Sequence, residues 1–437
     1  MKKLVNFSVA LLTTTLLCAS CQKEDVVVTS DVSTAVKSEV QTSKNLHVSY
    51  KDAIQIATEA VAMLEGDAQT RSAVKRRVDL SKVKYHVTPQ TRSGEGGDTL
   101  YYVVNYADSA GFALVSTTRA DGDPLIAVTE QGNYTPGEET GNPGFDMYIS
   151  ILNDRPSPKP EGPTLPIDTI DHGIDFIIVY NYPDTISSTS TQRGPYLTVK
   201  WTQESPYNKY CYDENNVLCP AGCVAIAVAQ LMSYYERPTS FIRTHDGSNT
   251  IQPLNWDGIK LYPTIYSASE TNKDALAHLI REIGHLALMD YNPGSSGAYN
   301  LFANIAMANL GYSQGTIRDY GFATMQSELD NARPVYMSGA SASNTSGHAW
   351  VVDGYKIQNY TIMYYNLWSD GTREFTGSNS YSHKYLHINW GWNGDCNGYF
   401  QDGVFDTSQS YALDGTAYMS RNYTTFLKMI TGIVPLN

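Results

Sequence analysis

Apolar residues recur at helical spacing in three separate segments of the chain. The first lies within 50–64 and is closed by Gly66, the second begins at Cys223 and stops before Pro238, and the third covers roughly 273–287. A period near 3.6 residues predicts amphipathic helices that each bury one face. The apolar stripe of the first helix consists of Ala53, Ile56, Ala57, Ala60, Val61 and Leu64.

Short strand-like runs follow the first helix and are separated by Gly and Asp turns, which favour antiparallel pairing. A helix packed on a small antiparallel sheet makes an α+β domain. We expect this domain at 46–154. Its predicted strands are Lys84–Thr88, Leu100–Tyr106, Gly111–Ser116 and Pro124–Thr129.

The length of the chain indicates a second domain. Its 437 residues, 42% of them hydrophobic, exceed one ordinary domain and can build more than one core. A Pro-rich stretch within 155–166 marks the start of a connector, which we place at 155–193. The second folded domain is then expected at 194–437.

The N-terminus has the pattern of an export signal. Two lysines precede an apolar stretch, Leu4–Leu17, that is too short to span a bilayer and is followed by small residues. We expect residues 1–21 to be a signal peptide and the polar residues 22–45 to be a flexible tether. The segment before Cys21 resembles a bacterial lipoprotein cleavage box, which would make Cys21 the lipidated residue. An ordinary secretory signal cut nearby is the alternative, so the predicted location is the cell surface or the medium.

The charge of the chain argues against a nucleic-acid partner. The formal net charge is -13, from 31 Lys and Arg against 44 Asp and Glu. Phosphate contacts need a basic face, and the only short basic cluster is 75–77. Contact with a membrane is expected only through a lipid on Cys21.

Cys223 is the first candidate for chemistry. It stands at the start of an apolar helix, directly after Gly222, where unpaired N–H groups and the helix dipole favour a thiolate. A reactive nucleophile fits this position. A small apolar residue that serves only packing fits it too.

Two further fragments supply partners for such a thiol. His348 lies between a loop rich in Gly, Ser and Thr and a strand-like run, 349–355. A later fragment, Asn389–Trp392, offers an amide to orient an imidazole and indoles to shield it from water. Gln203 lies upstream of Cys223, where a side-chain amide can serve as an oxyanion donor beside the Cys223 N–H. Each fragment alone is also compatible with core packing or a surface amide.

Together these residues resemble the streptopain family of papain-like cysteine peptidases. The resemblance rests on four motifs in the same order across the C-terminal half: Trp201-x-Gln203 with Pro206-Tyr207-Asn208, Gly222-Cys223-Val224-Ala225, Gly347-His348-Ala349, and Asn389-Trp390-Gly391-Trp392. It implies an α+β, two-lobed, papain-like catalytic domain preceded by the small α+β domain. The activity implied is that of a cysteine endopeptidase acting on proteins or peptides.

The resemblance also implies a role for each matched residue. Cys223 would be the nucleophile, His348 the general base and Gln203 an oxyanion donor. Either Asn389 or Trp390 would orient His348. Residues implied to contact substrate are Gly347, Trp392, and Ser295 or Ser296 in a loop that is equally compatible with a plain turn.

The N-terminal domain resembles the inhibitory prodomain of the same family. The protein would then be a zymogen whose own prodomain is its intramolecular partner. We place the activating cut within the Ser/Thr/Gln-rich stretch Ser187–Arg193 of the connector. An accessory or adhesive domain without a regulatory role is the alternative.

The remaining cysteines do not predict a metal site. The paired short spacings of structural zinc sites are missing from the set Cys211, Cys219, Cys223 and Cys396. Export would permit a disulfide between Cys211 and Cys219, although spacing cannot establish connectivity. We therefore expect no metal and no cofactor.

Two other functions use the same residues. A transglutaminase-like acyl transferase has the same thiol and imidazole chemistry, and would incorporate amines faster than water. A non-enzymatic surface lipoprotein could retain the cleft as a binding site. Retention of all four motifs favours the peptidase.

Overall fold

The structure is a computed structural model that describes residues 48–65, 78–87, 99–119, 123–153, 182–340, 347–367, 372–405 and 427–436. Residues 45–437 form one compact unit. The predicted signal peptide, the tether, Cys21 and residues 155–181 of the predicted connector lie outside the described residues. Among the described residues, no helix combines the length and apolar character needed to cross a membrane.

The N-terminal part has the predicted helix and antiparallel strands, with one more helix at its end. Helix α2 packs on the sheet through the predicted apolar stripe, whose alanines and Val61 are buried. The additional helix, α3, was not predicted, although most of its side chains are apolar and buried. The elements are α2 (Tyr50–Glu65), β1 (Val78–Val87), β2 (Thr99–Tyr106), β3 (Phe112–Ser116), β4 (Leu125–Thr129) and α3 (Pro143–Asn153).

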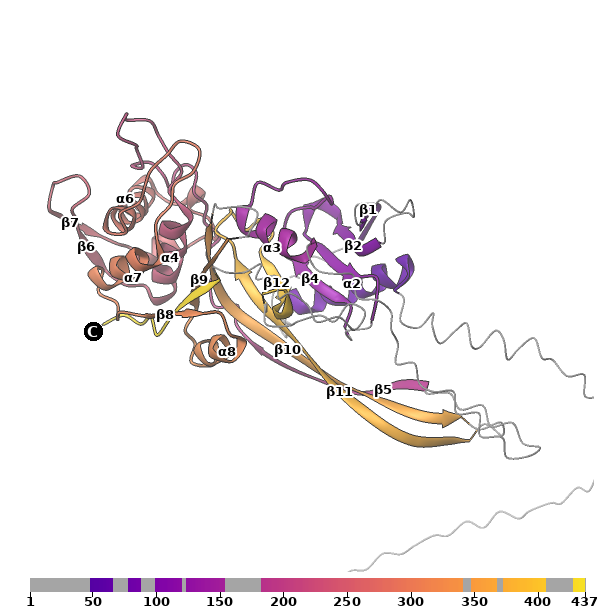
Figure 1. The fold of residues 1–437 in the computed structure, drawn as a ribbon. Coiled ribbons are helices and arrows are strands. Elements are labelled where there is room, and N and C mark those ends of the chain that lie inside the picture. The colour runs from indigo at the N-terminus through magenta and orange to yellow at the C-terminus, as the bar shows by residue number, and fades with distance from the viewer. Residues whose placement is uncertain are drawn as a thin grey trace, which may run out of the picture. The chain divides into compact units, whose positions relative to one another are not determined.

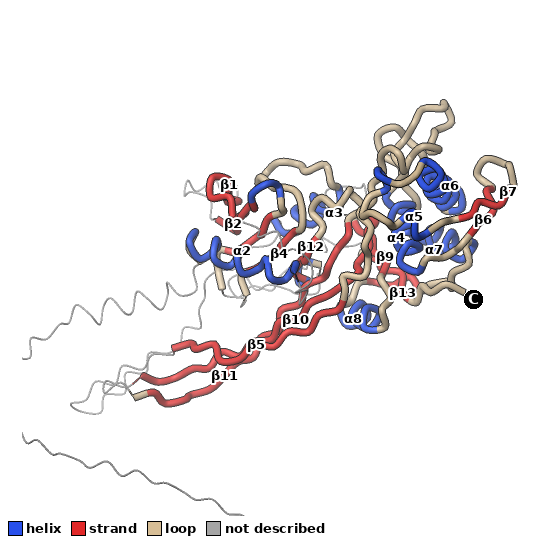
Figure 2. The backbone as a smooth tube through the Cα atoms, turned by 180° about the vertical axis from the view of Figure 1, so that it is seen from behind, coloured by secondary structure: helices blue, strands red, loops and turns tan. Residues whose placement is uncertain are grey.

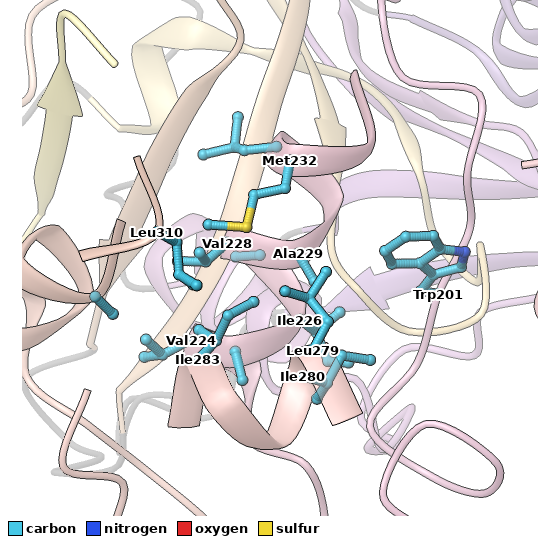
Figure 3. Packing of buried hydrophobic residues seen from close by; sticks show 14 of the residues in the cluster. Trp201, Val224, Ile226, Val228, Ala229, Met232, Leu279, Ile280, Ile283 and Leu310 are labelled. Atoms are coloured by element: carbon cyan, nitrogen blue, oxygen red, sulfur yellow. The ribbon is translucent and has the colours of Figure 1, made fainter. Parts of the chain in front are cut away.

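A cluster of helices makes the second part of the unit, on the opposite side of the molecule from α2 (Figure 1). Figure 3 shows its core, where residues of α4 and α6 interdigitate with Leu310 of the segment after α7. Helix α6 begins after Ser269, whose side chain accepts a hydrogen bond from the N–H of Asn272 and so caps the helix. The elements are α4 (Cys223–Tyr235), β6 (Ser240–Arg243), β7 (Thr250–Pro253), α5 (Trp256–Ile259), α6 (Glu270–Leu286) and α7 (Asn300–Asn309).

One antiparallel sheet runs through both parts of the chain. Its order is β1-β2-β3-β4-β12-β11-β10-β9-β13-β8, with β5 paired to β10 outside this path. Strand β4 pairs with β12, so the N-terminal strands continue the sheet of the C-terminal part. The remaining elements are β5 (Tyr182–Arg193), β8 (Thr316–Asp319), α8 (Phe322–Asp330), β9 (Val335–Gly339), β10 (His348–Leu367), β11 (Arg373–Asn389), β12 (Gly398–Gln401) and β13 (Lys428–Thr431).

The two parts also share a hydrophobic core. Phe145 and Tyr148 of α3 pack edge-to-face against Phe400 of β12, and Trp350 and Trp390 belong to the same cluster. The α+β class is therefore confirmed, but the N-terminal domain does not bury its apolar surface by itself. The domain bounds at 154 and 194 stay predictions.

Strands β10 and β11 form a hairpin far longer than the rest of the sheet. It projects from the body of the molecule, with β5 along one side (Figures 1 and 2). Strand β5 pairs with β10 from Arg193 opposite Tyr355 to Tyr182 opposite Tyr365. The stretch predicted to contain the activating cut is thus a paired strand rather than an open loop.

Candidate active site

The thiol of Cys223 stands at a helix start that glycine makes possible. Cys223 is the first residue of α4, and the chain enters the helix through Gly222 at φ +88°, in the left-handed region that favours glycine. A Cβ on Gly222 would lie 2.8 Å from Sδ of Met289 and 3.3 Å from the main-chain oxygen of Ser296. The segment with Met289 and Ser296 therefore lies directly against the chain before the thiol.

The start of β10 meets Cys223. Helix α4 packs against β9 and β10, and the Cys223 sulfur accepts a hydrogen bond from the main-chain N–H of Ala349, the residue after His348. Burial raises the pKa of the Cys223 thiol, and the N–H groups of Ala349 and Val224 offset this only in part. In this state the sulfur is a thiol at neutral pH, not a thiolate.

The imidazole of His348 is held by a main-chain carbonyl. Its Nε2 lies 2.9 Å from the carbonyl oxygen of Trp390. Because a carbonyl can only accept, Nε2 carries the proton and Nδ1 has the free lone pair. Burial lowers the pKa of His348 to about 4, although the Trp390 carbonyl acts in the opposite direction. In the described part of the chain, no hydrogen bond joins this ring to the Cys223 sulfur.

The amide of Asn389 is engaged elsewhere. Its Nδ2 donates to the carbonyl of Val199 at 2.7 Å, and its Oδ1 accepts from the N–H of Gly391 at 3.1 Å. The main chain of Trp390 is fixed instead by Asn397, whose Oδ1 accepts from the Trp390 N–H at 3.0 Å. Of the two residues proposed to orient the imidazole, Trp390 contacts it, and it does so through its backbone rather than its indole.

The segment with Gln203 is tied to three parts of the site. The N–H of Trp201 donates to Oε1 of Gln230 on α4 at 3.3 Å. The carbonyl of Trp201 accepts from the main-chain N–H of Asn393 at 3.0 Å. The carbonyl of Gln203 accepts from the N–H of Ala221 at 2.8 Å. These bonds place the buried Gln203 beside the chain that leads into α4.

Helix α3 of the N-terminal part covers the imidazole. A Cβ on Gly144 would lie 2.5 Å from Cδ2 of His348 and 2.4 Å from Cε3 of Trp390. The indole of Trp392 meets the same imidazole edge-on, with ring centroids 6.4 Å apart. As a result only 4% of His348 is exposed.

A partly buried ionic cluster joins the two parts. Glu130, which follows β4, lies 2.7 Å from Nζ of Lys200 and 3.3 Å from Nε2 of His387, whose Nδ1 is 2.6 Å from Asp353. Burial opposes the charge on His387, yet Asp353 and Glu130 raise its pKa to about 10. Burial also opposes the charge on Glu130, but His387 and Lys200 hold its pKa well below the usual range.

Comparison with known proteins identifies the family. The sequence model of the peptidase C10 family matches residues 201–400, which include the thiol, the imidazole and the loop that holds it. Residues 201–400 are a peptidase of the C10 family. Streptopain of Streptococcus pyogenes is 24% identical over 409 residues, covering 86% of this chain and 90% of streptopain.

Other relatives of this C10 peptidase come from different bacteria. The thiol protease/hemagglutinin PrtT of Porphyromonas gingivalis is 23% identical over 379 residues, covering 79% of this chain and 38% of that protein. A solved fragment of prointerpain A from Prevotella intermedia is 21% identical with a TM-score of 0.47, covering 80% of this chain and 98% of the fragment. The family match and the streptopain relatives make the protein a cysteine endopeptidase, as predicted.

The other predicted site residues lie at different distances along the chain from the thiol and imidazole of this C10 peptidase. Gly347 is exposed directly before His348, and Trp392 is half-buried against it. In the loop near Gly222, Ser296 is buried and accepts a hydrogen bond from the Asn292 N–H at 3.4 Å. Ser295 is exposed at a turn.

Sequence reasoning missed two residues that shape the site. Gly144 was not singled out because a lone glycine near a helix start gives no sign of what it will contact. Asn397 was missed because its role depends on the sharp turn that follows Trp390. Gly391, with φ +71°, and Gly394, with φ +88°, mark that turn and were the signal available.

The other described cysteines are structural. Cys211 and Cys219 are free, buried thiols whose main chains pair, with the Cys219 N–H donating to the Cys211 carbonyl at 2.8 Å. The disulfide considered for them is absent from the described residues. Burial raises the pKa of Cys211 to about 11, so this thiol stays neutral. Cys396 is also free and buried.

Proposed function

We propose that Cys223 and His348 are the nucleophile and the general base of this peptidase. The observation that carries the proposal is the hydrogen bond from Nε2 of His348 to the Trp390 carbonyl, because it leaves Nδ1 as the basic atom. The adjacent N–H of Ala349 contacts the Cys223 sulfur, so the two side chains arise from touching segments. Nδ1 would take the thiol proton as the sulfur attacks a peptide carbonyl.

The rest of the cycle follows from the groups around the thiol. The Gln203 side chain and the Cys223 N–H stabilise the oxyanion of the tetrahedral intermediate. His348 then gives its proton to the leaving amine, and later activates the water that hydrolyses the thioester. Cys223→Ala and His348→Ala should each abolish hydrolysis of a casein substrate with circular dichroism unchanged. Peptidase activity in purified Cys223→Ala would refute the assignment.

We propose further that the N-terminal part is an inhibitory prodomain and that the structure is the zymogen. Helix α3 buries His348, and burial favours the neutral forms of both groups, raising the pKa of Cys223 and lowering that of His348. Removing α3 would return water to the imidazole and lower the cost of the thiolate–imidazolium pair. The partners of the enzyme are therefore peptide substrates and its own prodomain.

Activation requires a cut after the prodomain, which we place within Ser187–Arg193. These residues lie in β5, paired with β10, and a peptidase needs an extended, unpaired chain in its cleft. Detachment of β5 would therefore precede the cut. Cys223→Ala protein incubated with active enzyme should yield a new N-terminus within this stretch. An uncut chain, or a first cut elsewhere, would contradict the proposal.

The enzyme is exported, and we propose that a lipid on Cys21 anchors it to the cell surface. The support is the small-residue box before Cys21 and the polar tether after it. Mass spectrometry of the mature N-terminus from the native bacterium should show diacylated Cys21. A mature chain that starts elsewhere, or an unmodified Cys21, would favour plain secretion.

A further inference from the structure

The helical part of the molecule contains a polar pocket whose lining includes none of the proposed catalytic residues. Its volume is about 380 Å³. It lies between the chain that follows Gln203, the segment after β6 and the outer face of α6. The lining residues are Tyr210, Tyr212, Arg243, His245, Asp246, His278 and Arg281.

Ring nitrogens of two histidines in this pocket face one another at hydrogen-bond distance. Nδ1 of His245 lies 2.8 Å from Glu282, which is 1% exposed, and since a carboxylate only accepts, this nitrogen carries the proton. Nε2 of His245 then has a free lone pair, and it lies 3.2 Å from Nδ1 of His278. On the far side, Nε2 of His278 lies 3.6 Å from Asp274, and its Nδ1 donates to Nε2 of His245 until a metal replaces that proton.

The spacing matches a shared metal ion. Two nitrogens bound to tetrahedral zinc at about 2.05 Å stand about 3.3 Å apart, against the observed 3.2 Å between His245 and His278. Ligand atoms of His245, His278 and Asp246 all lie within 4.8 Å of one another. The Glu282 carboxylate on the outer nitrogen of His245 matches the usual hydrogen-bond partner of a zinc-bound histidine, and Asp274 lies 3.6 Å from the outer nitrogen of His278.

We propose that His245, His278 and Asp246 form a zinc-binding site, with water as the fourth ligand. Asp246 now accepts from Arg243 and from the Ser248 N–H. Zinc would take one carboxylate oxygen and leave the other to Arg243. Three carboxylates, of Asp246, Asp274 and Glu282, lie at the pocket and are matched by Arg243, Arg281 and Lys209, which pairs with Asp274.

Neighbouring groups already hold the rings in place for a metal. The Tyr210 ring stacks on His278 with centroids 3.9 Å apart and planes 8° from parallel. Its hydroxyl bonds to Asp274, the same carboxylate that faces His278. Glu282 also accepts from the N–H groups of Thr244 and His245. A bound zinc would thus link the segment after β6 to α6.

The test uses the full-length Cys223→Ala protein, which cannot digest itself. Titration with Zn²⁺ should show one site per chain and raise the unfolding temperature. Titration with Co²⁺ should give the visible spectrum of a tetrahedral nitrogen and oxygen site without a thiolate charge-transfer band. His278→Gln and Asp246→Asn should each weaken zinc binding about 10- to 100-fold. The matched control is His285→Gln, an exposed histidine on the same helix, which should bind as the parent does.

Three results would overturn the proposal. They are a folded parent that binds no zinc, zinc affinity unchanged in both His278→Gln and Asp246→Asn, and a thiolate band in the cobalt spectrum. His278→Gln could fail to fold because its ring is buried, so Asp246→Asn, in an exposed position, then decides alone. The Cys223→Ala chain lacks the nucleophile, so this outcome is independent of the peptidase assignment.

Discussion

Replacing Glu130 with Gln should loosen the prodomain without touching the catalytic residues. Glu130 is the prodomain's charge in the partly buried ionic cluster, and Lys200 and His387, which it contacts, belong to the catalytic part. Gln has almost the same shape, so packing is kept while the charge is lost. His387 keeps its 2.6 Å contact with Asp353. The substitution therefore weakens the contact between the two parts.

The size of the effect follows from exposure. The contact with His387 is buried, the imidazole being 5% exposed, and a hydrogen bond between charged groups there is worth about 2 kcal/mol. The contact with Lys200, whose side chain is 31% exposed, is partly screened and adds about 0.5 kcal/mol. At 1.4 kcal/mol per factor of ten, the loss of both raises the open fraction of the zymogen about 60-fold.

The assay is labelling of Cys223 in the intact zymogen. An epoxide thiol-protease inhibitor reacts with the thiolate, which α3 disfavours by burying His348, so its rate, read by mass spectrometry, should report the open fraction. Glu138→Gln, which alters an exposed prodomain carboxylate, is the matched control and should label like wild type. Equal labelling of Glu130→Gln and wild type, within a factor of two, would refute the role given to this cluster.

Three further predictions concern acid, the oxyanion and the entry to α4. The neighbours of Glu130 hold its pKa below 4.5. The stabilisation that its charge gives to the contact between the two parts is therefore present above pH 4.5 and is lost as the pH falls below it. His387, with a pKa of about 10, stays charged over this range. Labelling of wild type should accelerate between pH 5 and pH 3, and a flat profile would contradict this. Gln203→Ala should lower kcat about 10²- to 10³-fold in steady-state assays of the mature enzyme; an unchanged kcat would remove Gln203 from the oxyanion site. Gly222→Ala should destabilise the Cys223→Ala protein by about 1–3 kcal/mol in urea, because of its φ of +88° and the nearby Met289; equal stability would contradict the strain argument.

The elements with a clear hydrophobic period were predicted well. The helix starting at Cys223 appears as Cys223–Tyr235, and the third predicted helix, 273–287, appears as Glu270–Leu286. Both have capping or breaking residues at their ends, which fix the boundary locally. Helix α3 was missed because its sequence is apolar on nearly every face, which erases the period that signals a helix.

The continuity of the sheet could not be predicted. Nothing in the sequence of β4 says that its partner is β12, more than 250 residues away, because pairing between distant strands depends on the whole fold. The order of the motifs predicted that the segment with His348 would meet the start of the helix at Cys223, and Ala349 contacts the sulfur. It could not predict that the carbonyl of Trp390, rather than the amide of Asn389, would meet His348, since a backbone oxygen carries no sequence signature.

The pairing of β5 with β10 has a consequence for the mature enzyme. Through eleven matched positions, from Tyr355 to Tyr365, the outer side of β10 is bonded to a strand that maturation is expected to sever. Once β5 has left, this edge of β10 has unpaired backbone N–H and C=O groups over about 35 Å, and an extended polypeptide can bind to them. A polypeptide bound there would lie on the same strand that begins with His348. Maturation would then create a binding edge as well as expose the nucleophile.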